Sequence, residues 1–428
     1  MKISSLWLAA LALASSALAA PITESASPVS YKNHQVIRFT VATEQQAAQL
    51  RAIVSRHDDG ISAWTDIHAG AAADLLVPPT AASKIAGALA AIEHKVLVSD
   101  LQANIDAERA HSEQNSHKLT EALKSGALAA PTAATVFSDY QDQATYESFI
   151  ASLPGVTKQS IGTTYQGRSI NAFSFGTGSK RIVFNGGIHA REWISPAVVT
   201  YVANYLTGST SDAVALRSKF TFTVIPVLNP DGYAYTRSTD RLWRKNREPN
   251  SGSSCVGTDP NRNFPYKWGG EGASTSKCAE DYRGTAALST KEAQALTSFI
   301  KSLSNVVSYI DFHSYSQLWM YPWGYDCNAR LPEPELTDLK TGGSKAVAAL
   351  EAVNGVSFTN GQSCLVTYPA AGATDDWTYS IGVKYTYSVE LRDTGDNGFT
   401  LPASQIVPSG KEVVAAVVAL WQYVATKV

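Results

Sequence analysis

The sequence of 428 residues predicts an α/β protein whose largely parallel sheet is covered by helices on both faces, preceded by a small α+β domain. Two observations support this prediction. From about residue 136 onward, short strands rich in Val, Ile and Phe alternate with helical stretches, as in sheets that are buried on both faces. Before about residue 108, a separate group of strand and helix patterns precedes a stretch with little periodicity.

Residues 20–108 form the predicted N-terminal domain. Its first strand largely alternates apolar and polar residues, and its first helix has apolar residues at helical spacing. We expect the helices to lie on one face of an antiparallel sheet. The expected strands span 35–41, 73–77 and 95–98, and the expected helices span 44–53 and 81–92.

Residues 109–135 are predicted to be an exposed, cleavable linker. They are rich in polar residues and alanine, contain Pro131 and show little periodicity. Because exposed polar segments are preferred sites of proteolysis, we expect a protease to separate the two domains here.

Residues 136–428 form the predicted second domain. Its second strand is followed by Asn229-Pro230-Asp231-Gly232, which is a turn signal. In sheets of this kind, ligands bind outside the carboxyl ends of the strands, so polar residues at those ends are the candidates for a site. The expected strands span 181–184, 220–227, 306–312 and 385–389, and the expected helices span 195–206, 290–301 and 340–353.

The composition excludes a disordered chain and argues against two classes of partner. Hydrophobic residues make up 44% of the chain and charged residues 17%, which suits a packed core. Lys and Arg number 35 and Asp and Glu 37, a formal net charge of -2. We therefore expect neither nucleic acid nor an anionic membrane as a partner. No partner motif stands out, and a monomer is expected.

The N-terminus predicts a secreted protein. Lys2 is followed by an apolar run at 6–14 and by the small-residue pattern Ala17-Leu18-Ala19. These features are typical of a signal peptide. A membrane anchor is the alternative, but the run is shorter than the ~20 apolar residues of a membrane span. Residues 1–19 are therefore predicted to be a signal peptide, and the protein extracellular, where disulfides form.

Two histidines and two glutamates follow the predicted strands of the second domain. His189 and Glu192 come just after the first strand, His313 follows the third, and Glu390 ends the fourth. Of the 8 histidines in the chain, His189 and His313 alone lie beyond residue 118. A lone histidine at a strand end is usually structural, and His-x-x-Glu is a weak motif by itself. Two His and one Glu nevertheless form a typical catalytic zinc site, because three protein ligands leave a position open for water.

Six short motifs resemble those of the secreted zinc carboxypeptidases of the pancreatic A/B type, in the same order and at fitting spacing. They span 187–194, 229–233, 241–245, 259–263, 313–317 and 390–395. Residues 95–102 are also similar to the family's activation domain. The resemblance implies a prepro-enzyme with a mixed, largely parallel sheet and one zinc ion per catalytic domain. Its substrates are expected to be the C-termini of peptides or proteins.

The resemblance implies a role for each catalytic residue. The two histidines and Glu192 correspond to the zinc ligands. Glu390 is implied to act as the general base and then as the acid that protonates the leaving amine. Arg244 is implied to stabilise the oxyanion, and Asp259 to accept a hydrogen bond from the far nitrogen of a zinc-binding histidine.

An enzyme that removes C-terminal residues must recognise a free carboxylate. Arginine suits this task because its planar group grips a carboxylate through two parallel hydrogen bonds. Without the resemblance, Asn261 and Arg262 would be interpreted as turn residues. The positions that match the family's carboxylate-binding residues are Asn261, Arg262 and Tyr368. Those that match the neighbouring subsites, where packing and surface charge are the alternative interpretation, are Arg191, Tyr315 and Phe399.

The pocket for the terminal side chain is expected to end at Asp375, from the alignment of Tyr368 and Trp377 with the family motif. In B-type members a carboxylate there pairs with Lys or Arg, since a buried charge needs a counter-charge. A preference for C-terminal Lys or Arg is therefore predicted. Asp376 is adjacent, so a shift of one residue changes the assignment, and an A-type preference for aromatic or aliphatic residues is the alternative.

The resemblance also implies two disulfides, Cys255 with Cys278 and Cys327 with Cys364. The alternative, a four-cysteine metal site, lacks any Cys-x-x-Cys spacing.

The N-terminal domain is then implied to be a propeptide that covers the cleft until an activating protease cuts the linker. The cut is expected after Arg109, Lys118 or Lys124, and an acidic residue such as Asp66 is a candidate to occupy the Arg262 site. Two other classes of function are the alternatives. The sequence has no Gly-x-Ser-x-Gly motif, which argues against a serine hydrolase. A non-catalytic relative typically lacks a metal ligand or the general base, and this sequence retains all of them.

Overall fold

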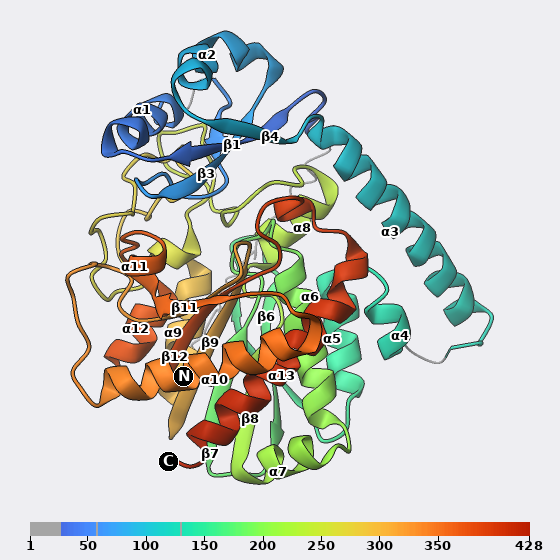
Figure 1. The fold of residues 1–428 in the computed structure, drawn as a ribbon. Coiled ribbons are helices and arrows are strands. Elements are labelled where there is room, and N and C mark those ends of the chain that lie inside the picture. Colours follow the sequence, from blue (N-terminus) through green and yellow to red (C-terminus); the bar gives the residue numbers. More distant parts are fainter. Residues whose placement is uncertain (1–26, 57–58, 129–130) are drawn as a thin grey trace, which may run out of the picture.

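A computed structural model describes residues 27–56, 59–128 and 131–428 (Figure 1). The predicted signal peptide, residues 1–19, lies outside the described residues. The N-terminal domain holds a sheet of 4 strands in the order β2-β3-β1-β4. These strands are β1 (Gln35–Val41), β2 (Ser62–Ala63), β3 (Ala71–Val77) and β4 (His94–Val98). All their pairings are antiparallel, as predicted.

The small sheet is covered on one face by its own helices and on the other by the large domain. Ile37 and Phe39, alternate residues of β1, pack with the helices α1 (Glu44–Val54) and α2 (Ala82–Ala91). Val36 points to the opposite face and shares a core with Tyr315 and Phe399 of the large domain. The strand alternation seen in the sequence therefore determines which face of the N-terminal sheet packs against the large domain.

The large domain holds a sheet of 8 strands in the order β11-β10-β12-β9-β7-β8-β6-β5. The neighbours β12, β9, β7 and β8 run parallel, whereas β5, β6 and β10 introduce antiparallel pairs. The predicted mixed, largely parallel sheet is confirmed. The strands are β5 (Thr157–Thr163), β6 (Ser169–Gly176), β7 (Lys180–Asn185), β8 (Phe220–Ile225), β9 (Val306–Ser314), β10 (Leu318–Tyr321), β11 (Thr359–Gln362) and β12 (Tyr385–Leu391).

Helices cover both faces of this sheet (Figure 1). Phe184 of β7 packs in a core with residues of α6 (Ile194–Thr207), α10 (Glu335–Asn354) and α13 (Ile406–Val424). Its neighbour Val183 points the other way and packs with Leu296 of α9 (Lys291–Ser302) and Trp377 of α12 (Thr374–Ser380). Shorter helices are α4 (Ala133–Val136), α5 (Gln143–Ser152), α7 (Ser211–Lys219), α8 (Pro230–Ser238) and α11 (Ser363–Val366).

The segment predicted as a linker is largely helical. Helix α3 (Leu101–Lys124) begins in the N-terminal domain and runs along the outside of the large domain (Figure 1). Leu101 and Ile105 anchor its first turns in the core between the domains. Beyond Glu108 none of its described side chains is buried, which agrees with the predicted exposure. The helix lacks a long apolar stripe, so periodicity does not reveal it, but Ala, Glu, Gln, Lys and Leu favour helix.

The apolar C-terminal segment is a core helix. The stretch Ala403–Val424 is long and apolar enough to cross a membrane, but 56% of its most apolar window is buried inside the protein. Within it, α13 packs against α6 and α10. This agrees with the packed terminal helix expected from the sequence.

Candidate metal centre and substrate cleft

Three potential metal ligands meet at the carboxyl end of the parallel strands. His189 and Glu192 lie in the turn between β7 and α6, and His313 lies at the end of β9. Their ligand atoms lie within 4.8 Å of one another, and all three side chains are buried. Glu192 lies between the rings, with Oε1 2.7 Å from His189 Nδ1 and Oε2 3.1 Å from His313 Nδ1.

This donor set fits a zinc ion. The two Nδ1 atoms lie 3.1 Å apart and both face the Glu192 carboxylate. A single cation satisfies all three groups at once, whereas two imidazole lone pairs at that distance repel. Burial opposes the charge of Glu192, but the two imidazoles outweigh it and lower its pKa. Two histidine nitrogens and one carboxylate oxygen are ligands that catalytic zinc sites use.

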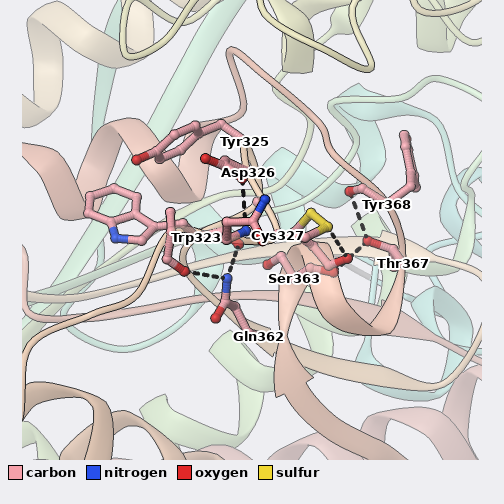
Figure 2. The surroundings of a disulfide bond; sticks show 12 residues. Trp323, Tyr325, Asp326, Cys327, Gln362, Ser363, Thr367 and Tyr368 are labelled. Atoms are coloured by element: carbon pink, nitrogen blue, oxygen red, sulfur yellow. Dashed lines mark hydrogen bonds between the residues drawn. A yellow bond between two sulfur atoms is a disulfide. The ribbon is translucent and has the colours of Figure 1, made fainter.

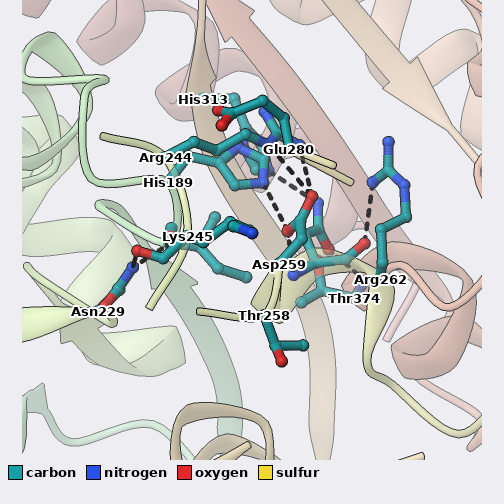
Figure 3. A network of polar contacts seen from close by, with 12 residues as sticks. His189, Asn229, Arg244, Lys245, Thr258, Asp259, Arg262, Glu280, His313 and Thr374 are labelled. Atoms are coloured by element: carbon teal, nitrogen blue, oxygen red, sulfur yellow. Dashed lines mark hydrogen bonds and ion pairs between the residues drawn. The ribbon is translucent and has the colours of Figure 1, made fainter. Parts of the chain in front are cut away.

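The turn that carries His189 is tied to the segment that carries Arg244. The Asn229 side chain donates hydrogen bonds to the carbonyl oxygens of Ile188 (3.2 Å) and Lys245 (3.1 Å). Figure 3 shows Asn229 reaching Lys245 below the histidine. The Asn-Pro-Asp-Gly stretch, expected from the sequence to be a turn, is the start of helix α8, and its first residue, Asn229, positions both sides of the site.

Asp259 lies between His189 and Arg244 (Figure 3). Its Oδ1 is 3.2 Å from His189 Nε2, and its Oδ2 accepts hydrogen bonds from Arg244 Nε (3.1 Å) and Nη2 (2.8 Å). Burial opposes the charge of this carboxylate, but Arg244 and His189 outweigh it and lower its pKa. A second carboxylate, Asp311, lies 3.0 Å from His313 Nε2 and was missed in the sequence.

Glu390 lies beside the metal ligands. It is on β12, directly opposite His313 in the pairing of β12 with β9. Its Oε2 is buried and has no hydrogen-bond partner among the described residues. Burial raises the pKa of Glu390 to about 8, against the nearby charge of His313. The carboxyl group is thus poised to exchange a proton near neutral pH.

A cavity of about 130 Å³ joins the metal ligands to the predicted substrate residues. Arg262 and Tyr368 lie on its wall, and Arg262 Nη2 donates a hydrogen bond to the Tyr368 hydroxyl. The Asn261 side chain holds Thr374 N through a bond of 2.9 Å. Arg244, Glu390 and Asp375 also line the cavity, so the structure brings these predicted residues together.

The two adjacent aspartates of α12 have different surroundings. The Asp376 carboxylate accepts hydrogen bonds from the backbone N–H groups of Gly324 and Tyr325, both at 2.8 Å. Both of its oxygens therefore bind the protein's own backbone. Asp375 lines the cavity and accepts a bond of 3.1 Å from Ser363 Oγ. Burial raises the pKa of Asp375. No Lys or Arg forms an ion pair with Asp375 in the described part of the chain.

The predicted neighbouring subsites are covered by the propeptide. The Arg191 guanidinium lies 4.1 Å from the centre of the Phe399 ring. Trp64 of the propeptide packs on Phe399 at 5.1 Å between ring centres. The Tyr315 hydroxyl donates a hydrogen bond of 2.7 Å to Asp74 of the propeptide. Neither Trp64 nor Asp74 was singled out in the sequence, because contacts between separate domains leave no local pattern.

Asp66 of the propeptide reaches the predicted carboxylate-binding residues. It lines the same cavity as Arg262, Arg244 and Tyr368. Burial raises the pKa of Asp66 to about 6, while Arg262 and Arg244 act in the opposite direction. An acidic side chain of the N-terminal domain therefore shares the cavity with Arg262, and its occupation of the Arg262 site stays a prediction.

Both predicted disulfides are present, Cys255–Cys278 and Cys327–Cys364. Figure 2 shows the second one, which joins the segment after β10 to α11 next to Ser363. Tyr368 lies a few residues further along the same segment (Figure 2). The cross-link therefore holds the wall of the cavity that carries Ser363 and Tyr368.

Both domains resemble known proteins. The family model "Zinc carboxypeptidase" matches residues 143–416, and the model "Carboxypeptidase activation peptide" matches residues 37–108. The chain is 36% identical to carboxypeptidase A1 of Homo sapiens over 92% of this chain and 94% of that protein. It is 43% identical to carboxypeptidase B of Astacus astacus over 66% of this chain and 95% of that protein. The crystal structure of thrombin activatable fibrinolysis inhibitor matches with a TM-score of 0.81 and 30% identity, over 93% of this chain and 100% of that chain.

Proposed function

Because the chain belongs to the zinc carboxypeptidase family, we propose that it is a secreted zymogen whose processed form removes single Lys or Arg residues from the C-termini of peptides and proteins. Membership of the family makes it a metallocarboxypeptidase with one catalytic zinc ion and an activation peptide. The observation that carries the preference is Asp375, a buried carboxylate on the wall of the cavity.

The catalytic residues are proposed to act as follows. His189, Glu192 and His313 hold the zinc ion, which supplies Lewis acidity to a carbonyl group and lowers the pKa of water. Glu390 accepts a proton from the attacking water and delivers it to the leaving amine nitrogen. Its unpartnered, buried Oε2 supports this role. Arg244, which is held in place by Asp259, stabilises the negative charge that develops on the carbonyl oxygen.

The substrate is proposed to be held at both ends of its last residue. Arg262, with Asn261 and Tyr368, binds the free carboxylate, and Asp375 pairs with the cationic side chain. A buried carboxylate is costly without a counter-charge, so an incoming Lys or Arg gains more than an apolar residue does. Relatives named carboxypeptidase A and carboxypeptidase B both match this chain, and Asp375 is the reason to favour the B-like preference.

The propeptide is proposed to block the cleft until the linker is cut. Trp64 covers Phe399, and Asp66 lines the same cavity as Arg262, the residue proposed to bind the substrate carboxylate. We place the activating cut after Lys124, because it is the last residue of α3, whereas Arg109 and Lys118 lie inside that helix. The last turn of an exposed helix unfolds more readily than its interior, so a protease can bind and cut the chain there.

One experiment tests the preference and the covering together. The full chain and protein cut after Lys124 are each given four peptides that differ only in their last residue: Lys, Arg, Phe or Leu. Release of that residue is followed by mass spectrometry. We expect the cut protein to release Lys and Arg faster than Phe and Leu by about tenfold or more, and the full chain to be much slower.

Each of the three parts of the proposal has its own contradicting result. Faster release of Phe or Leu contradicts the role of Asp375. A full chain that already works at the rate of the cut protein contradicts the covering by Trp64 and Asp66. Hydrolysis that survives complete removal of zinc by a chelator contradicts the roles of the three metal ligands.

A further inference from the structure

Asp311 is a buried carboxylate next to a proposed metal ligand. It lies two residues before His313 on β9, so both side chains point to the same face of the strand. Asp311 is 0% exposed, and its Oδ2 lies 3.0 Å from His313 Nε2. We propose that Asp311 is a positioning residue that orients His313 for zinc binding. This inference rests on the proposed function, because it takes His313 as a ligand.

The contact fixes which nitrogen of His313 carries the proton. An ionised carboxylate oxygen can only accept a hydrogen bond, so we infer that His313 Nε2, 3.0 Å from Asp311 Oδ2, carries the proton. The lone pair is then on Nδ1, the atom that lies 3.1 Å from Glu192 Oε2 and faces the metal cluster. Asn261 Nδ2, a donor, would favour the opposite form, but it lies 3.4 Å from the same Nε2, further away than the Asp311 carboxylate at 3.0 Å. Asp311 therefore selects the form of the ring that can bind a metal.

Other bonds hold the Asp311 carboxylate in place. Its Oδ1 accepts a hydrogen bond of 2.7 Å from Asn185 Nδ2, on the neighbouring strand β7. Its Oδ2 accepts a second bond of 2.6 Å from Thr374 Oγ1, at the start of α12. Asn185 is in turn fixed by the Tyr309 hydroxyl, which donates to its Oδ1 at 2.5 Å. With both oxygens anchored, the carboxylate cannot rotate away from His313.

The two metal-binding histidines are thus supported in the same way. Asp259 faces Nε2 of His189, and Asp311 faces Nε2 of His313. Carboxylates that orient metal-binding histidines typically contribute about 10- to 100-fold to metal affinity. Asp259 also binds Arg244, so a change there disturbs two groups. Asp311 is the cleaner place to measure the effect on zinc.

The test uses zinc affinity of the full chain, measured by competition with a chelator. We expect Asp311→Asn to weaken zinc binding by about 10- to 100-fold. The control is Glu147→Gln, which removes another buried carboxylate that accepts a bond from an asparagine, Asn171, far from the site. The control should bind zinc as the wild type does.

Exchanging the side chains of Asn185 and Asp311 separates the effect of Asp311 on zinc affinity from its effect on the stability of the fold. The double variant Asn185→Asp, Asp311→Asn keeps one carboxylate and one amide between β7 and β9 but moves the charge away from His313. We expect the thermal stability of its zinc-free form to return toward that of the wild type, and zinc affinity to exceed that of the Asp311→Asn chain only as far as the amide oxygen replaces the carboxylate as acceptor for His313 Nε2. An Asp311→Asn chain that binds zinc within twofold of the wild type overturns the inference, as does a double variant that regains stability with no gain in zinc affinity over Asp311→Asn.

The protonated nitrogen of His313 can also be identified in the wild-type protein, so this test does not depend on whether a variant folds. In ¹⁵N-labelled, zinc-loaded full chain, nuclear magnetic resonance should show a proton on Nε2 of His313 that exchanges slowly with solvent. An unprotonated Nε2 overturns the inference whatever the variants do. If the wild-type chain binds no zinc at all, the proposed function fails instead, so the two failures are distinguishable.

Discussion

Replacing Glu390 by Gln should lower kcat by about 10²- to 10⁴-fold while zinc stays bound, because the amide keeps the size of the side chain but cannot accept and return a proton. Glu390 is the group placed for this task. It lies opposite His313 across β12 and β9, and its buried Oε2 has no partner among the described residues. The measurement is kcat of the cut protein on a peptide ending in Arg, with zinc content determined on the same sample.

The matched control is Glu271→Gln, an exposed glutamate of the same domain, which should leave kcat and zinc content unchanged. A Glu390→Gln variant that keeps more than about a tenth of the wild-type kcat would show that another group transfers the proton. Loss of zinc from the variant would instead mean that Glu390 supports the metal site.

Replacing Asp375 by Asn should remove the preference for basic residues. Removing one partner of a buried pair of opposite charges typically weakens binding by about 3 kcal/mol. If the pair forms in the transition state, this loss lowers the rate by about 100-fold. We therefore expect kcat/KM for a peptide ending in Arg to fall by about 100-fold. The value for the matching Phe peptide should change little, because the pocket keeps its shape. The ratio of the two values is the measured quantity.

The neighbouring aspartate supplies the control. Asp376→Asn removes a carboxylate that binds the backbone of Gly324 and Tyr325, so it should lower stability. The Arg-to-Phe ratio should nevertheless be kept, since this ratio does not depend on the fraction of active protein. If Asp376→Asn changes the ratio and Asp375→Asn does not, the specificity residue has been assigned one position too early.

The parts of the fold that were predicted are those with strong local patterns. The central strands are apolar runs, so β7, β8, β9 and β12 were found within a few residues of their ends. The strand β5 (Thr157–Thr163) was missed because it is a mostly exposed edge strand with little apolar alternation. The strands β10 and β11 were missed because each has only 4 residues. Helix α3 was missed because exposure leaves no apolar stripe to detect.

The site residues that lie at the C-terminal ends of the parallel strands could be predicted from the sequence. His189, His313 and Glu390 were found because parallel strands deliver their C-terminal residues to one edge. Asp311 was not found, because inside a buried strand an aspartate has no signal of its own; its role depends on Asn185 and Thr374, which come from distant parts of the chain. The same reason hides the contacts that Trp64 and Asp74 make across the domain boundary.

The most direct measurement is a crystal structure of the cut, zinc-loaded Glu390→Gln variant with a peptide that ends in Arg. The terminal carboxylate should lie against Arg262, the terminal guanidinium against Asp375, and the anomalous signal of zinc between His189, Glu192 and His313. A peptide whose last residue lies outside the cavity, or a zinc signal away from these three side chains, would contradict the proposed site.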